Sequence, residues 1–274
     1  MNADEWTGAT GRSWADEWKR TDRSFSMLTE HLLDRIRSMN FARVLDVGSG
    51  AGELSLAIGR AHPSAQVMGV DVSPPLVEAA AQRGERRANV SFVCADAASW
   101  QPDPEFRADL VVSRHGVMFF EDPPAAFRNI AAIAAPEARL LFSCFRAPSE
   151  NPFFTEVGAL LPESAMPPPP TGAAGPFAFA DAGHVSAILE QGGWRDIAFE
   201  QYDFAMIAGA GSDPVADAVV YYSRIGPAAR AMRELPIDRH EEFQARLAGL
   251  MAKHCREGIV VLPASTWVVT ARKA

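Results

Sequence analysis

Short apolar runs alternate with segments of helical periodicity along most of the chain, and this alternation predicts an α/β protein. The runs that we interpret as strands lie at residues 44–47, 66–71, 90–95, 109–113, 139–145, 194–204 and 266–271. Several of them are apolar at nearly every position, as strands are when both faces of a parallel sheet are covered. We therefore expect one mostly parallel sheet with helices on both faces.

The strand that ends at Val47 is followed by a glycine turn that leads directly into a helix. Gly48, Gly50 and Gly52 lack a Cβ atom, so the backbone can turn sharply and a ligand can lie against the peptide groups. From residue 53 to 61 the apolar positions follow a helical spacing. The order strand, glycine turn and helix predicts a nucleotide-type binding loop.

The spacing of these glycines indicates the kind of cofactor. A dinucleotide fingerprint requires G-x-G-x-x-G, whose third glycine would fall on Glu53, and no phosphate-binding G-K-S/T follows. A carboxylate at this position would face the pyrophosphate of NAD. A cofactor without phosphate groups would not be repelled by this carboxylate, so the turn favours a phosphate-free cofactor.

Acidic residues end the next two strands. Asp71 ends the second strand, where a carboxylate is placed to accept hydrogen bonds from the two ribose hydroxyls of an adenosine. Asp96 follows the third strand. Val72 and Leu76 flank the start of the intervening helix, where they can cover one face of an adenine. Together these residues predict an adenosine site along the carboxyl edge of the sheet.

The fourth strand is followed by Arg114, His115 and Gly116, at the edge where open α/β sheets place their reacting groups. Histidine is the side chain best suited to remove a proton near neutral pH, so His115 is the candidate general base. Two other interpretations stay open. His115 can instead pack beside Met118 or hold a loop carbonyl, and Arg114 can orient an acidic acceptor.

Composition and charge exclude some function classes. The chain has 274 residues, of which 48% are hydrophobic, enough for one substantial core and a modest cap. Its net charge is −8 and it has no cluster of Lys and Arg, so the basic patch of a nucleic-acid-binding protein is missing from the sequence. No apolar run reaches the ~18 residues of a membrane span, and the first residues lack the pattern of a signal peptide. We expect a cytoplasmic protein without membrane partners, either monomer or homodimer.

Four stretches carry a resemblance to a known family. The motif D-x-G-x-G-x-G, from Asp46 to Gly52, resembles the first motif of the class I S-adenosylmethionine-dependent methyltransferases. Three further stretches are similar to the bacterial small-molecule branch of this family, which is ubiquinone/menaquinone-biosynthesis-like and methyltransferase type 11-like. They are the start W-x-G-x-x-G-x-x-W, the stretch S-R-H-G-V-M-F-F-E-D-P and the end L-P-A-x-x-W-x-V-T-A. Many relatives carry an aromatic residue at the position of His115.

The resemblance implies a Rossmann-like sheet of seven strands, with S-adenosyl-L-methionine as cofactor and S-adenosyl-L-homocysteine as product. It also implies that Asp96 and the Ala97 backbone recognise the adenine. The residues expected to bind the cofactor are Asp46, Gly48, Ser49, Gly50, Gly52, Asp71, Val72, Leu76, Asp96, Ala97 and Ser113, and the candidate catalytic residue is His115. No H-x-E, C-x-x-C or acidic cluster suggests a metal site.

Two segments outside the sheet pattern are expected to cover the site. Residues 1–39 begin with a polar stretch that carries three tryptophans and continue as a helix over 21–39, which either packs against the sheet or closes over the cofactor. We expect two parts, an N-terminal helical lid at residues 1–39 and a methyltransferase domain at residues 40–274. Within the domain, residues 147–179 are expected to form a Pro-rich connection without regular structure, and residues 209–256 a helical cap.

The expected reaction is in-line methyl transfer to a small-molecule acceptor, most readily to oxygen, with nitrogen and carbon left open. The protein then mainly aligns the acceptor and excludes water. The alternatives are methylation of a protein or peptide side chain, a non-catalytic S-adenosylmethionine-binding protein and a nucleotide-dependent oxidoreductase.

Overall fold

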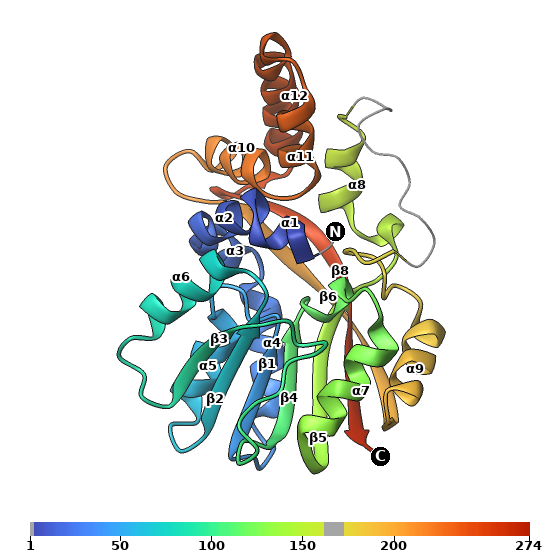
Figure 1. Cartoon of the computed structure of the whole chain (residues 1–274). Helices are drawn as coiled ribbons and strands as arrows, with labels where there is room; N and C mark the ends of the chain where they lie inside the picture. Colours follow the sequence, from blue (N-terminus) through green and yellow to red (C-terminus); the bar gives the residue numbers. More distant parts are fainter. Residues whose placement is uncertain (1–2, 162–172) are drawn as a thin grey trace.

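The protein is described by a computed structural model over residues 3–161 and 173–274 (Figure 1). Within these residues, seven strands form one sheet in the order β3-β2-β1-β4-β5-β8-β6, and a short eighth strand, β7, pairs with β8. The strands are β1 Arg43–Val47, β2 Gln66–Asp71, β3 Val90–Cys94, β4 Ala108–Arg114, β5 Ala134–Phe145, β6 Trp194–Gly209, β7 Cys255–Arg256 and β8 Ile259–Lys273. Strands β1 to β5 are parallel, and β8 is antiparallel to both of its neighbours. The predicted Rossmann-like α/β sheet is confirmed.

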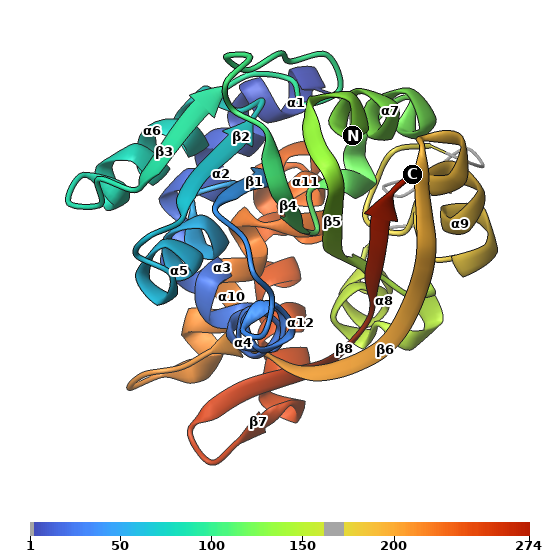
Figure 2. The same ribbon diagram turned by 90° about the horizontal axis from the view of Figure 1, so that it is seen from below.

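Helices lie on both faces of this sheet, with α4 and α5 on one side and α7 and α9 on the other (Figure 2). The helices are α1 Ala3–Thr7, α2 Ala9–Asp16, α3 Trp18–Ser24, α4 Ser26–Ile36, α5 Glu53–Ala61, α6 Pro74–Gly84, α7 Pro123–Ile133, α8 Pro152–Gly158, α9 Ala182–Gln191, α10 Pro214–Arg224, α11 Gly226–Glu234 and α12 His240–Lys253. Among the described residues, no helix is both long and apolar enough to cross a membrane.

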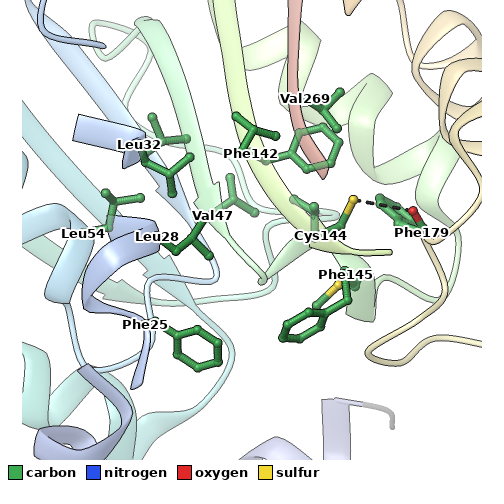
Figure 3. Packing of buried hydrophobic residues seen from close by; sticks show 14 of the residues in the cluster. Phe25, Leu28, Leu32, Val47, Leu54, Phe142, Cys144, Phe145, Phe179 and Val269 are labelled. Carbon is green, nitrogen blue, oxygen red and sulfur yellow. Dashed lines mark hydrogen bonds between the residues drawn. The ribbon is translucent and has the colours of Figure 1, made fainter. Parts of the chain in front are cut away.

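The core lies between the central strands and their covering helices. Leu28, Leu32 and Ile36 are spaced four residues apart on α4, and each is at most 1% exposed. Figure 3 shows the first two beside Val47 of β1 and Leu54 of α5. The glycine turn therefore starts from a strand whose position is fixed by packing on both faces.

The N-terminal range is divided differently from the prediction. The single helix expected over residues 21–39 breaks at Phe25 into α3 and α4. Because the apolar stripe of α4 is buried in the core, the expectation of a lid over all of residues 1–39 is wrong for α4, which is part of the sheet's covering layer. Only α1 to α3 lie across the carboxyl edge of the sheet (Figure 1).

The connection after β5 contains a helix that the sequence did not indicate. Asn151 is buried, its amide nitrogen donates to the Ala147 carbonyl over 3.0 Å, and its side-chain oxygen accepts from the Ser265 backbone over 2.9 Å. This anchor on β8 lets Pro152 begin α8, so the absence of regular structure predicted for residues 147–179 is wrong here. The proline tetrad at 167–170 lies outside the described residues.

The cap is narrower than predicted because the strands around it are longer. Strand β6 continues to Gly209, and residues 255–256 form β7, so the cap helices occupy residues 214–253. Beyond the sheet, β6 and β8 continue as a ribbon that carries α10 to α12 (Figure 1).

Candidate active site

A cavity of about 1410 Å³ lies at the carboxyl ends of β1, β2 and β4, beneath α1 to α3 and beside α10 and α11. A pocket for one small ligand measures roughly 300–1,000 Å³, so this cavity has room for a cofactor and a second ligand. Ten of the twelve predicted site residues line it: Asp46, Gly48, Ser49, Gly50, Asp71, Val72, Leu76, Asp96, Ala97 and His115.

The three glycines of the turn have positive φ angles, of 67°, 54° and 85°, but different surroundings. A Cβ atom on Gly48 would lie 2.7 Å from the Gly116 Cα atom, so this glycine lets the two loops meet. Gly50 faces open space in the cavity wall, where a ligand can approach its backbone. A Cβ atom on Gly52 would meet the Phe92 ring at 2.7 Å. Gly52 therefore serves the packing of α5 and, unlike the other two glycines, does not line the cavity.

Asp71 connects the turn to the next helix. One carboxylate oxygen accepts from the Gly50 N–H over 2.8 Å, and the other accepts from the Ser73 N–H over 2.9 Å. Burial raises the pKa of Asp71, and these backbone donors oppose that rise. Each oxygen keeps a second lone pair, so Asp71 can still accept ribose hydroxyls while it holds the turn.

Asp46 and Ser113 lie beneath the turn. Asp46 is 1% exposed and accepts a hydrogen bond from the Ser55 hydroxyl over 2.6 Å. Burial raises its pKa to about 6, and the bond from Ser55 opposes the rise. Ser113 is fully buried and is not part of the cavity wall, and its hydroxyl accepts from the Gly116 N–H over 3.1 Å. The structure thus places Ser113 behind the cavity wall, where it holds the loop that carries His115.

The predicted adenine contacts lie together on another part of the wall. Val72 and Leu76 follow β2, and Asp96 and Ala97 follow β3, the strand paired with it. Asp96 is exposed, and one of its oxygens accepts from the Ala98 N–H over 2.9 Å. The wall thus offers apolar side chains for a ring face and a carboxylate at its edge.

His115 has an uncommon backbone conformation, and its side chain lies between two aromatic rings. Its φ angle is 64°, its ring stacks on Phe145 with centroids 4.1 Å apart, and the Phe25 ring lies tilted against it at 5.3 Å. Both ring nitrogens are buried and have no hydrogen-bond partner among the described residues. Burial, followed by the charge of Arg114, lowers the pKa of His115 to about 3. The imidazole is therefore neutral over the physiological pH range.

Part of the chain matches known methyltransferases. Residues 44–137 match a family described as a methyltransferase domain. A malonyl-[acyl-carrier protein] O-methyltransferase from Halorhodospira halophila is 30% identical over 43% of this chain and 40% of its own length. A demethylmenaquinone methyltransferase from Thermus thermophilus is 33% identical over 40% of this chain and 50% of its own length. The match thus spans half or less of these two relatives.

The fold is similar to that of a phosphoethanolamine N-methyltransferase from Haemonchus contortus that was solved in complex with S-adenosyl-L-methionine. The TM-score is 0.58 at 17% identity, and the similarity covers 99% of this chain and 59% of the other. Residues 44–137 thus match a methyltransferase domain, and the chain is similar to the class I S-adenosylmethionine-dependent methyltransferases. The predicted family is confirmed, including its bacterial small-molecule branch.

The candidate site contains a charged cluster that the sequence did not reveal. Arg83 of α6 donates to the Ala51 carbonyl over 2.6 Å, to Asp22 of α3 over 2.6 Å and to Glu53 of α5 over 2.9 Å. Its guanidinium also lies 3.8 Å from the centroid of the Trp18 ring. Burial and then the Glu53 carboxylate raise the pKa of Asp22 to about 7. The cluster fastens α3 to the glycine turn.

The W-x-G-x-x-G-x-x-W start of the chain packs over the same cavity. The Trp6 ring lies 5.5 Å from Trp14 and 5.2 Å from Phe119, with edge-to-face geometry in both pairs. A Cβ atom on Gly11 would lie 2.3 Å from the Ser73 hydroxyl. The absence of a side chain at this glycine therefore lets α2 lie directly on the start of α6, beside Asp71.

Proposed function

We propose that this protein transfers a methyl group from S-adenosyl-L-methionine to a small-molecule acceptor. The observation that carries the proposal is the continuity of one cavity, which joins the glycine turn and Asp71 to the buried ring of His115. One end of this cavity suits an adenosine and the other suits an apolar molecule. Oxygen is the first candidate for the methylated atom, and nitrogen and carbon are alternatives.

The residues of the wall fit this cofactor. Asp71 would accept the ribose hydroxyls, Val72 and Leu76 would cover the adenine, and Gly50 leaves space for a ligand against the backbone. At the start of α5 the wall carries Glu53 rather than a Lys or Arg. This carboxylate disfavours a pyrophosphate, so a phosphate-free cofactor is the better fit.

When bound, S-adenosyl-L-methionine would supply a methyl group on a sulfonium sulfur. An acceptor atom would take this methyl in line as the carbon–sulfur bond breaks and S-adenosyl-L-homocysteine leaves, and a hydroxyl acceptor would release its proton to water. The role of this chain is to align the acceptor and to keep water away. A neutral His115 could accept or donate one hydrogen bond at the acceptor atom after a shift of its ring, because both ring nitrogens are buried in this structure. Because the pKa of His115 is about 3, it would contribute no acidic limb to the rate profile between about pH 5 and pH 9. We therefore propose that His115 contacts the acceptor without acting as a general base.

Two helical segments cover the cavity, α1 to α3 from the N-terminus and α10 and α11 from the cap, to which α12 also belongs. Ion pairs connect them: Arg20 of α3 contacts Asp217 of α10 at 2.6 Å, and Arg224 of α10 contacts the buried Glu17 at 2.6 Å. We propose that these segments act as one cover that closes when the cofactor binds. Such a cover explains how water is excluded.

The mostly apolar wall of the cavity supports a small acceptor over a protein or peptide side chain. The net charge of −8 supports a reaction without nucleic acid. We also propose that the protein acts in the cytoplasm, without a membrane partner, as a monomer or homodimer.

Calorimetric titration with S-adenosyl-L-homocysteine and, separately, with NAD tests the proposal. We expect the product S-adenosyl-L-homocysteine to bind in the micromolar range, about −8 kcal/mol, and NAD to show no heat of binding. Binding of NAD in place of the homocysteine product would overturn the proposal. Incubating the protein and a metabolite extract with methyl-labelled cofactor then identifies the labelled acceptor.

A further inference from the structure

Helix α3 is attached to the rest of the protein on two sides. Toward the cap, Arg20 and Arg23 contact Asp217 of α10 at 2.6 and 2.7 Å. Toward the sheet, Asp22 contacts Arg83 of α6 at 2.6 Å. The helix lies across the carboxyl edge of the sheet (Figure 1), so these two attachments hold it over the cavity.

The attachment to the sheet is made through two carboxyl groups. One nitrogen of the Arg83 guanidinium donates to Asp22 over 2.6 Å and to Glu53, the first residue of α5, over 2.9 Å. Another nitrogen donates to the carbonyl of Ala51 in the glycine turn over 2.6 Å. The side chains of Asp22 and Glu53 are only 15% and 22% exposed. Two carboxylates held on one donor and away from water repel each other, so such a pair tends to retain a proton.

The charges around Asp22 leave the two carboxyl groups with one close donor. Among the described residues, the charged groups that face Asp22 are Glu53 of α5, Arg83 of α6 and Arg114 of β4. Arg114 lies 3.9 Å from Asp22 and donates instead to the Thr29 hydroxyl over 2.6 Å. Burial, and then the Glu53 carboxylate, raise the pKa of Asp22 to about 7. The pair therefore exchanges one proton near neutral pH.

We propose that Asp22 and Glu53 form a proton-dependent latch that fastens α3 to the glycine turn. With one proton on the pair, the two carboxyl groups can share a hydrogen bond, and α3 stays over the cavity. When the proton leaves, two neighbouring carboxylates are kept from water, and separation of α3 from α5 lets both be hydrated. A lower pH thus favours the covered cavity. The latch goes beyond the proposed function, because it requires neither cofactor nor acceptor.

The size of the effect follows from the linkage between attachment and protonation. The pKa of Asp22 is about 7 with α3 attached and returns to its ordinary value of 3.8 when the helix is detached. Attachment is therefore strongest below about pH 4, weakens as the pH rises and levels off above about pH 7. Each pH unit between these limits changes the equilibrium about tenfold, so attachment should weaken roughly 100-fold from pH 5 to pH 8.

Hydrogen exchange of the protein without cofactor, followed by mass spectrometry at pH 5, 6, 7 and 8, tests the latch. Dividing the intrinsic exchange rate by the observed rate at each pH gives a protection factor that is free of the effect of pH on the exchange chemistry. Protection of α1 to α3 should fall roughly 100-fold over this range. These helices should also exchange faster than α9 at each pH, because they detach without global unfolding.

Variants assign the fall in protection to the latch. Asp22→Asn cannot lose a proton, so the fall should disappear. Glu53→Gln removes the second carboxylate and so lowers the pKa of Asp22, which should move the fall to lower pH and make it smaller between pH 5 and pH 8. Asp34→Asn, in an exposed ion pair with Arg37 at 2.6 Å on α4, is the matched control and should behave as the natural protein does.

Three results would overturn the latch. The first is a protection of α1 to α3 that does not change with pH, and the second is exchange of these helices at the same rate as α9, which means global unfolding. The third is an equal fall in Asp22→Asn, which would assign the proton to another group such as Asp46, whose pKa is about 6. If Asp22→Asn does not fold, an unshifted fall in Glu53→Gln overturns the latch instead. The proposed function is tested separately, by binding of S-adenosyl-L-homocysteine, and stands or fails without the latch.

Discussion

Replacing Asp71 by alanine tests whether the end of β2 holds the ribose of the cofactor. A hydrogen bond to a charged group contributes about 1.5–3 kcal/mol, and each 1.4 kcal/mol is about tenfold in affinity. Loss of one such bond should therefore weaken S-adenosyl-L-homocysteine binding roughly 10- to 100-fold. The structure makes this a lower limit, since the variant also deprives the Gly50 and Ser73 N–H groups of their acceptor.

The direct contact can be separated from the effect on the turn. Calorimetry with S-adenosyl-L-homocysteine and with its 2′-deoxy analogue measures the contribution of the ribose hydroxyl in each variant. In the natural protein the deoxy analogue should bind more weakly, whereas in Asp71→Ala both ligands should bind alike, because the acceptor is gone. A change confined to the turn would weaken both ligands equally and leave their ratio unchanged.

Asp103→Ala is the matched control. The Asp103 carboxylate also accepts a backbone N–H, from Glu105 over 2.9 Å, but it does not line the cavity. This variant should bind both ligands as the natural protein does. An Asp71→Ala protein that is folded, judged by its thermal transition, and that binds S-adenosyl-L-homocysteine within threefold of the natural protein would refute the assignment.

Two further predictions concern the cover. Cofactor binding should protect α1 to α3 and α10 to α12 together from hydrogen exchange, and equal exchange with and without ligand would identify both segments as fixed scaffold. Asp22 has its pKa raised from 3.8 to about 7, so its proton stabilises the fold fully below about pH 4, and this contribution is lost as the pH rises through 7. The Asp22→Asn variant should lack this loss of stability. Measured by urea denaturation, its free energy of unfolding relative to the natural protein should therefore rise between pH 4 and pH 8. A constant difference over this range would contradict the prediction that Asp22 is protonated in the folded protein.

Much of the fold and of the cofactor end of the site is determined by the sequence alone. The apolar runs locate the central strands, because a strand buried on both faces needs apolar side chains at nearly every position. Gly48, Gly50 and Asp71 are recognisable because chain order places the carboxyl ends of parallel strands at one edge. The structure puts all three on the cavity wall.

Features that depend on side chains from distant parts of the chain were decided by the tertiary structure. Asp22, Glu53 and Arg83 belong to three helices, and no spacing between them predicts that one guanidinium joins them. The apolar spacing of α4 fits a lid as well as a core helix, and only its burial against the sheet distinguishes the two.

The same reason explains why two predicted site residues lie outside the cavity wall and why burial lowers the pKa of His115. Ser113 and Gly52 have the right neighbours in sequence, but the side chain of one and the missing Cβ atom of the other face protein atoms instead of the cavity. His115 follows the fourth strand as predicted, yet its pKa depends on burial between Phe25 and Phe145, which come from elsewhere in the chain. Desolvation is a property of the packed surroundings, so only the tertiary structure could determine it.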